Sequence, residues 1–336
     1  GVTSNPTIFQ KAMAEGTRYD AQLRELGGDG RGAEETFFAL ASRDVGQACD
    51  LMRTVWDGGA GLSGYVSIEV DPTLAYDTDG TRAQAIDLHA AIDRPNLYVK
   101  IPATEAGLPA IEDMIADEDM AVTISHDGYI KRNPVTLYRA QRRGGKGKIG
   151  MGVKEEDFVV TLFTASTHES LLFFTDAGKV YWLKVHEIPD AGRAAKGKAL
   201  VNLLALSSDE QVTATVPVKE FREDQFVVMA TAQGIVKKTE LSAYSNPRQG
   251  GIIALSLDKG DRLISVHVTD GQREILLGTK KGITIRFKEE DVRSMGRTAH
   301  GVRGITLEEG NEVIGMETIT PDSTTQILTV TEGGYG

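Results

Sequence analysis

A pattern of paired strands recurs about every fifty residues from Asp119 onward, and this repeat constrains the fold more than any other feature of the sequence. In each repeat an apolar strand runs into a short turn, and a glycine stands at a fixed place in that turn. Glycine supplies the positive φ that tight hairpin turns require. The turns lie at residues 125–129, 175–179, 231–235, 279–283 and 331–335. Four-stranded repeats of this length predict an all-β, propeller-like fold with four blades and part of a fifth.

A glycine flanked by basic residues follows each of the first four hairpins by about twenty residues. One such loop is usually only a solvated turn, and its spacing is not that of a phosphate-binding P-loop. Recurrence in phase with the hairpins instead favours a curved basic track along successive blades. Glycines would let the backbone approach a duplex, while Lys and Arg would contact phosphates and bend the DNA without reading bases. The residues predicted to contact DNA are Gln141, Arg142, Arg143, Gly144, Gly145, Lys146, Gly147, Lys148, Arg193, Lys196, Lys198, Arg248, Arg297 and Arg303.

A net charge of −11 is unusual for a DNA-binding protein, so its distribution along the chain matters. Residues 1–116 hold 9 Lys and Arg against 18 Asp and Glu, and residues 117–336 hold 28 against 30. The acidic excess therefore belongs almost wholly to the first part of the chain. In the second part the basic residues are clustered, which is the relevant signal for a surface that faces phosphates.

Residues 1–116 alternate short apolar strands with helical patterns, which predicts a parallel sheet covered by helices. Lys100 and Glu69 interrupt two of the strands. Burial would make the lysine amine nucleophilic, as a Schiff-base enzyme requires. The plainer alternative places both side chains at strand ends in water. After an opening strand-to-helix segment, helices are expected at 34–55, 80–92 and 105–115, and strands at 64–70 and 96–102.

Three segments of this first part, 1–7, 66–71 and 98–104, resemble consecutive strand motifs of the transaldolase family. The resemblance implies a (β/α)8 barrel in which Lys100 forms a Schiff base with a ketose phosphate, with Asn5, Thr3 and Glu69 as polar neighbours. It also implies that the strand before Gly1 and all strands after that of Lys100 are missing. Three strand–helix units of eight cannot close a barrel. We therefore expect a partial (β/α) barrel without useful transaldolase activity.

The heptad 141–147 matches, letter for letter, the signature box of the C-terminal domain in the A subunit of DNA gyrase, and segments 155–158, 198–204, 234–239 and 301–305 also resemble that domain. An intact box favours gyrase over the related protein of topoisomerase IV. The resemblance implies a β-pinwheel, six-bladed in the family, that wraps double-stranded DNA for a type IIA topoisomerase and cleaves nothing itself. It also implies the gyrase subunits as partners, an A dimer with B, although the dimerising and cleaving regions are not visible in this sequence.

The sequence thus predicts two unrelated domains, a transaldolase-like partial barrel at 1–116 and a gyrase-type β-pinwheel at 117–336. The leading hypothesis is a DNA-wrapping module. The alternatives are a transaldolase-type enzyme using Lys100 and a propeller scaffold for protein partners. We expect no cofactor and no metal site, because the six histidines are scattered, and a buried thiol at Cys49. A single cysteine, no signal peptide and no long apolar run predict a cytoplasmic protein.

Overall fold

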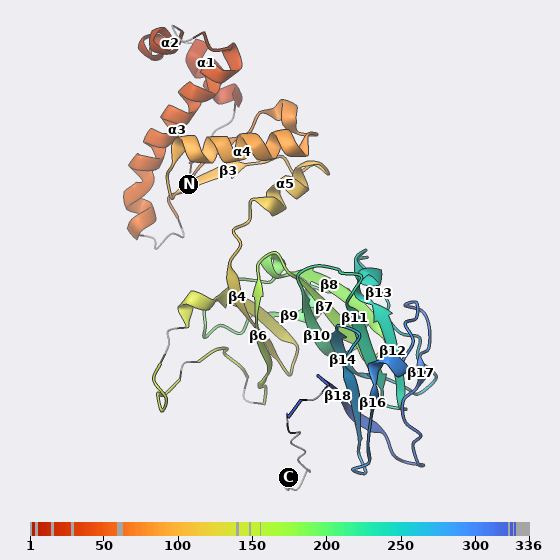
Figure 1. Cartoon of the computed structure of the whole chain (residues 1–336). Coiled ribbons are helices and arrows are strands. Elements are labelled where there is room, and N and C mark those ends of the chain that lie inside the picture. Colours follow the sequence, from red (N-terminus) through yellow and green to blue (C-terminus); the bar gives the residue numbers. More distant parts are fainter. Residues whose placement is uncertain are drawn as a thin grey trace. The chain divides into compact units, whose positions relative to one another are not determined.

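The computed structural model of the chain describes residues 2–3, 6–14, 17–27, 30–58, 63–138, 141–147, 149–154, 156–321, 323–324 and 326. The chain divides into two compact units, 1–115 and 116–336, both drawn in Figure 1. Among the helices of the described residues, none is both long enough and apolar enough to cross a membrane.

The first unit holds a parallel sheet with helices between its strands (Figure 1). Its strands are β1 (Val2–Thr3), β2 (Val66–Glu69) and β3 (Leu97–Lys100), in the order β1-β2-β3. Its helices are α1 (Pro6–Ala14), α2 (Asp20–Gly27), α3 (Ala33–Gly58), the 3-10 turn η1 (Pro72–Leu74), α4 (Thr78–Ile92) and α5 (Gly107–Asp113). The predicted alternation of strands and helices around a parallel sheet is confirmed.

Helices α3 and α4 share one apolar core with β2 and β3. Along β2, the alternate residues Val66 and Ile68 are buried, as expected for a strand with one covered face. Helix α3 contributes Ala41, Val45 and Cys49, which are four residues apart and therefore lie on one face. Cys49 is fully buried, as the sequence predicted, and burial raises the pKa of its thiol.

The second unit consists of antiparallel sheets, four of which lie within the described residues (Figure 1). The first sheet holds β4 (Asp119–Ser125), β5 (Tyr129–Pro134), β6 (Val159–Ser166) and β9 (Lys198–Ala199). The second holds β7 (Ser170–Thr175), β8 (Lys179–Lys184), β10 (Val212–Val218) and β13 (Ile252–Ile253). The third holds β11 (Phe226–Thr231), β12 (Ile235–Glu240), β14 (Leu263–Thr269) and β17 (Val302–Arg303). The fourth holds β15 (Glu274–Thr279), β16 (Thr284–Lys288) and β18 (Val313–Ile319).

Short 3-10 turns follow the second hairpin strand of each of the four repeats that the structure describes. They are η2 (Val135–Leu137), η3 (Val185–Glu187), η5 (Leu241–Tyr244) and η6 (Glu289–Asp291), while η4 (Leu200–Asn202) follows β9. The strand orders of the four sheets are β6-β4-β5-β9, β10-β7-β8-β13, β14-β11-β12-β17 and β16-β15-β18.

The last strand in each of the first three sheets comes from the following repeat. Strand β9 pairs with β5, β13 with β8, and β17 with β12. Each of these repeats therefore needs the next one to complete its sheet, which interlocks neighbours along the chain. The predicted four-stranded blades are confirmed for these three repeats, and the fourth sheet has three strands within the described residues. The expected fifth turn, at 331–335, lies outside them.

The hairpin glycines adopt the backbone conformation that the sequence predicted. Gly128, Gly178, Gly234 and Gly282 have φ values of 78°, 74°, 85° and 80°. The N–H of each donates to the carbonyl three residues earlier, at 2.9–3.0 Å. An L-residue with a Cβ is strained in this region, so glycine fixes the turn at this point of these four repeats.

The cores of the second unit lie between successive sheets. One apolar cluster joins the first and second sheets, another the second and third, and a third cluster the third and fourth. Strand β7 shows how this works: Leu171 and Phe173 pack into the first cluster, while Leu172 and Phe174 pack into the second. Burial on both faces explains why the four central residues of β7, 171–174, are a continuous apolar run.

Candidate nucleic-acid interface

The basic segments that follow the first four hairpins contain residues 142–145, 192–195, 248–251 and 296–299. Each of these four segments forms the same kind of tight turn, closed by a hydrogen bond from an N–H to the carbonyl three residues earlier. These bonds join Gly145 to Arg142 (3.0 Å), Ala195 to Gly192 (2.9 Å), Gly251 to Arg248 (2.9 Å) and Ala299 to Gly296 (3.1 Å). Arg143, Arg193 and Arg297 therefore hold the second position of the turn in three of the four segments. The third segment has Gln249 at this corner.

Backbone hydrogen bonds attach two of these segments to the second hairpin strand of the preceding sheet. Arg132 of β5 donates its N–H to Pro189 O at 3.1 Å and accepts from the Ala191 N–H at 3.2 Å. In the third sheet, Lys238 of β12 accepts from the Met295 N–H at 2.8 Å. The turns that carry Arg193 and Arg297 are thus held along sheet edges rather than on free loops.

Close packing against these edges also explains two of the glycines. A Cβ on Gly197 would lie 2.3 Å from Ile130 O, and a Cβ on Gly301 would lie 2.7 Å from Val236 O. Both glycines also have positive φ, at 84° and 101°. The sequence suggested that such glycines admit a duplex, whereas at these two positions they admit the neighbouring protein backbone.

Consecutive basic segments are tied to one another as well. The Gly152 N–H donates to Ala195 O, and the Ser256 N–H donates to Ala299 O in the corresponding place two repeats later, both at 3.3 Å. Gly147 of the first segment and Arg193 of the second line one open cleft of about 580 Å³. The first two arginine turns are therefore neighbours on the surface of the second unit.

The transaldolase-like residues of the first unit lie at the ends of adjacent strands. Glu69 is paired in register with Lys100, and Lys100 Nζ lies 3.2 Å from Glu69 Oε1. The Lys100 side chain is 55% exposed and that of Glu69 is 18% exposed, which fits the plainer alternative for the lysine, exposure at a strand end. Thr3 pairs in register with Ser67. Asn5 lies outside the described residues.

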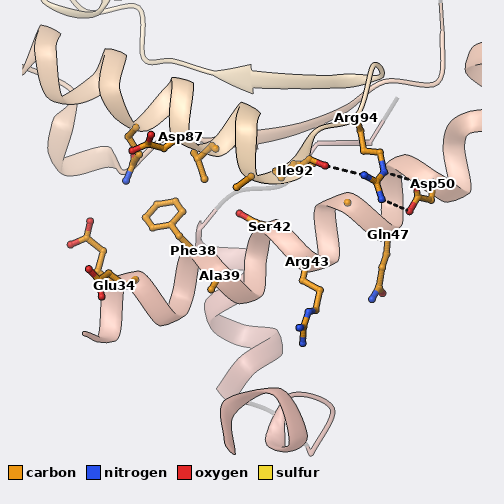
Figure 2. Close-up of a pocket in the computed structure, with 15 residues that line it drawn as sticks. Glu34, Phe38, Ala39, Ser42, Arg43, Gln47, Asp50, Asp87, Ile92 and Arg94 are labelled. Atoms are coloured by element: carbon orange, nitrogen blue, oxygen red, sulfur yellow. Dashed lines mark hydrogen bonds and ion pairs between the residues drawn. The ribbon is translucent and has the colours of Figure 1, made fainter. Parts of the chain in front are cut away.

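A separate groove of about 670 Å³ runs between α3 and α4 (Figure 2). Phe38 of α3 lines it, and near one end Arg94 donates from Nε and Nη2 to the Asp50 carboxylate at 2.6 and 3.1 Å. This bidentate hydrogen bond lowers the pKa of the Asp50 carboxyl. Neither Lys100 nor Glu69 lines the groove, so it is not the transaldolase-like site. Within the described part of the chain, no cluster of three or more His, Cys, Asp and Glu is placed to hold a metal ion.

Comparison with known proteins connects each unit with a family. Residues 119–166, 169–219, 225–270 and 273–320 match the family described as "DNA gyrase C-terminal domain, beta-propeller", and each segment contains the hairpin of one sheet. The chain belongs to this gyrase family. Residues 1–125 match the family described as "Transaldolase/Fructose-6-phosphate aldolase". The two-family composition predicted from the sequence is confirmed.

Several relatives of the gyrase-type region are named as the A subunit of DNA gyrase. That of Salmonella typhimurium is 51% identical over 226 residues, which are 67% of this chain and 26% of the relative. That of Staphylococcus aureus is 48% identical, with the same coverage of 67% and 26%. The chain thus spans about a quarter of the length of these relatives.

Among solved structures, the C-terminal domain of DNA topoisomerase IV has a TM-score of 0.54 to this chain at 32% identity. The match covers 62% of this chain and 63% of that one. Together with the family match and the antiparallel sheets, it confirms the predicted propeller-like pinwheel for the gyrase-type region.

Most of the predicted DNA contacts lie on the surface of the gyrase-type region. Gln141 is exposed too, but its side-chain amide closes the box: Oε1 accepts from the Gly147 N–H at 3.2 Å, and Nε2 lies 3.4 Å from Gly147 O. Gln141 therefore holds the turn closed. The other exposed residues of the predicted set are Arg142, Arg143, Gly144, Gly145, Lys146, Gly147, Lys198, Arg248 and Arg303.

Three predicted contacts are half-buried, and the protein itself engages two of them. Lys196 places Nζ 3.4 Å from the centroid of the Tyr129 ring, a cation–π contact. Arg297 Nη1 lies 3.5 Å from Ile253 O. Arg193 is half-buried as well, and Lys148 lies outside the described residues.

Two buried lysines beneath the arginine turns, Lys131 and Lys237, were not predicted from the sequence. Burial lowers the pKa of both, that of Lys237 to about 7, and the nearby Arg193 and Arg297 lower them further. Each lysine stands three residues after the hairpin glycine of its repeat. This shared register is the sequence signal that could have found them.

Proposed function

We propose that residues 117–336 bind double-stranded DNA through its phosphates and bend or wrap it, as the C-terminal module of a gyrase-type type IIA topoisomerase. The observation that carries this proposal is the common turn in which Arg143, Arg193 and Arg297 hold the same position. Guanidinium groups at the same corner of the first, second and fourth repeats can contact phosphates at intervals along one duplex. Contacts of this kind position DNA without identifying its bases.

The placement of the turns supports bending as well as binding. Two arginine turns lie on the edges of different sheets, so a duplex that contacts both follows the surface from one sheet to another. Bending a site of 20–30 base pairs by 40–90° costs about 1–6 kcal/mol, which the added phosphate contacts must offset. The proposed partners are double-stranded DNA and, through the family, the A and B subunits of gyrase. Strand cleavage is not part of the proposed activity.

Duplex binding over a salt series, measured by fluorescence anisotropy, tests this function. We expect log K to fall linearly with log salt, and the slope to become shallower by up to about 2.7 in Arg143→Ala/Arg193→Ala/Arg297→Ala, since each phosphate contact contributes about 0.9. Arg222→Ala is the matched control, because Arg222 is exposed and pairs with Asp224 outside the turns. No salt-dependent binding by the folded chain would refute the proposal and favour the protein-scaffold alternative.

Wrapping needs a topological measurement. A nicked plasmid is closed by ligase in the presence of the chain, and its linking number is measured after the protein is removed. We expect a shift that grows with the ratio of protein to DNA and disappears in the triple arginine variant. Binding without any shift would limit the function to DNA binding.

The pair formed by Lys100 and Glu69 motivates a second candidate, transaldolase-type transfer through a Schiff base. We propose that the first unit is a partial (β/α) barrel without useful activity of this kind, because its described sheet has three strands and a closed barrel has eight. Treatment with a ketose phosphate and borohydride, followed by mass spectrometry, tests this. We expect no adduct at Lys100, so the unaltered chain and the Lys100→Arg control should give the same mass spectra. A stoichiometric adduct at Lys100 that is absent in Lys100→Arg would establish the enzymatic alternative.

A further inference from the structure

Two buried lysines reach the arginine turns from inside the sheets. Lys131 of β5 donates from Nζ to Gly192 O at 3.0 Å and to Arg193 O at 2.5 Å. Lys237 of β12 donates from Nζ to Arg297 O at 2.5 Å and to a second carbonyl, just after β13, also at 2.5 Å. In both repeats a bonded carbonyl belongs to the arginine at the corner of the turn. The lysine therefore fixes the backbone from which the guanidinium group extends.

The second repeat shows a different pair of residues at the same places. The position three residues after its hairpin glycine is Tyr181, whose ring would lie 2.7 Å from a Cβ on Gly251. The turn beside it, 248–251, has Gln249 rather than arginine at the corner. A buried lysine thus accompanies the corners at Arg193 and Arg297, and a tyrosine accompanies the corner at Gln249.

Stability alone does not favour an ammonium group at this position. Taking a cation out of water is costly, and hydrogen bonds to two carbonyl oxygens offset that cost only in part. The same desolvation lowers the pKa of Lys237 to about 7. The second repeat has the buried Tyr181 at the equivalent position, so a side chain without a charge is compatible with the strand.

We infer that Lys131 and Lys237 are positioning residues that hold Arg193 and Arg297 on the sheet edge for contact with DNA phosphates. The inference rests on the proposed DNA binding. Neither ammonium group can reach DNA itself, because both side chains have no exposed surface. Each lysine acts through the arginine of the following repeat.

A double-mutant cycle in the full chain tests this relation, using Lys237→Met, Arg297→Ala and the combined variant in the anisotropy salt series. We expect Lys237→Met to weaken binding several-fold and to make the slope shallower by up to about 0.9, the value for one phosphate contact. The combined variant should bind no more weakly than Arg297→Ala, because both changes remove the same contact. Additive losses, or unchanged binding in Lys237→Met, would overturn the inference. Lys131→Met with Arg193→Ala gives the same cycle if Lys237→Met does not fold.

Hydrogen exchange without DNA separates this inference from the proposed function. The Ala299 N–H closes the turn on Gly296 O at 3.1 Å, and we expect it to exchange several-fold faster in Lys237→Met than in the unaltered chain. The Gly251 N–H is the internal control, because Tyr181 rather than a lysine lies beside its turn. Equal protection of Ala299 in both proteins would refute positioning by Lys237. If the Ala299 N–H exchanges faster in Lys237→Met but the unaltered chain binds no DNA, the proposed function is refuted, while the stabilisation of the turn by Lys237 is supported.

Discussion

Two glycines with positive φ, Gly301 and Gly282, differ in how closely other atoms surround them. Alanine substitutions at the two sites can therefore distinguish the stability cost of the backbone conformation from the cost of a steric clash. Gly301 has a φ of 101°, and a Cβ there would lie 2.7 Å from Val236 O. Gly282 has a φ of 80° and nothing within 4 Å of its Cβ position. Alanine at either site is forced into the left-handed region, which costs about 1–2 kcal/mol. Only Gly301→Ala must also push its segment away from β12.

The displaced segment includes β17, which completes the third sheet. Its movement would break backbone hydrogen bonds at this edge, such as that from the Gly304 N–H to Gly234 O at 2.8 Å. One or two such bonds are worth about 1 kcal/mol each. We therefore expect Gly301→Ala to lose about 2–4 kcal/mol of unfolding free energy, against about 1–2 kcal/mol for Gly282→Ala.

Urea unfolding followed by Trp182 fluorescence measures both losses in the second unit, because Trp182 lies in β8. A Trp56→Phe background removes the signal of the first unit, since Trp56 lies in α3. Gly301→Ala should also weaken DNA binding, because it displaces the turn of Arg297, while Gly282→Ala should not. Equal destabilisation by the two alanines would show that glycine is needed at position 301 only for its positive φ, and would refute the argument from close packing.

Three further predictions concern pH and the first unit. The pKa of Lys237 falls from 10.5 to about 7 on folding, so the unfolded chain binds more protons between these two pH values. The free energy of unfolding should therefore rise from pH 7 to pH 9, as measured by urea unfolding. An equal rise of the unfolding free energy in Lys237→Met would contradict the lowered pKa. Asn96→Ala removes buried hydrogen bonds to Cys49 O (2.8 Å) and Gly64 O (3.0 Å), and should cost the first unit about 1–3 kcal/mol in urea unfolding followed by Trp56 fluorescence; no measurable loss would refute this. Arg94→Ala breaks an exposed ion pair and two hydrogen bonds of 3.2 Å from Nη1 to Ile92 O and Asp93 O, and should cost less than about 2 kcal/mol in the same assay; a larger loss would contradict this.

The sequence predicted the sheets well where local chemistry decides them. The hairpin glycines require positive φ, and their even spacing therefore revealed the repeats. The outer strands β9, β13 and β17 were not predictable in this way. Each is two residues long, too short for a periodic pattern, and its partner lies in the preceding repeat.

For the candidate DNA interface, the sequence located the segments that form the turns but not the neighbours of their individual side chains. The box pattern located the first turn, but not the inward bonding of Gln141 to Gly147. Lys196 was predicted to contact DNA, and the structure places its ammonium group over the ring of Tyr129 in β5, a contact that the sequence did not indicate. Lysine is rarely buried, so composition alone places Lys131 and Lys237 on the surface. Side-chain direction in these cases depends on neighbours that are distant in the sequence.

The outer strands supplied by the next repeat have a consequence while the protein is being synthesised. During synthesis, Ile130 of β5 cannot form its strand pairing with β9 until Lys198 has been made. In the same way, Val180 of β8 cannot pair with β13 until Ile252 has been made. At about 5–20 residues per second, each edge stays open for roughly 3–14 s. Unpaired edges are templates for pairing with other chains. A nascent chain of this design is therefore most prone to aggregate while the ribosome is one repeat ahead of the sheet being completed.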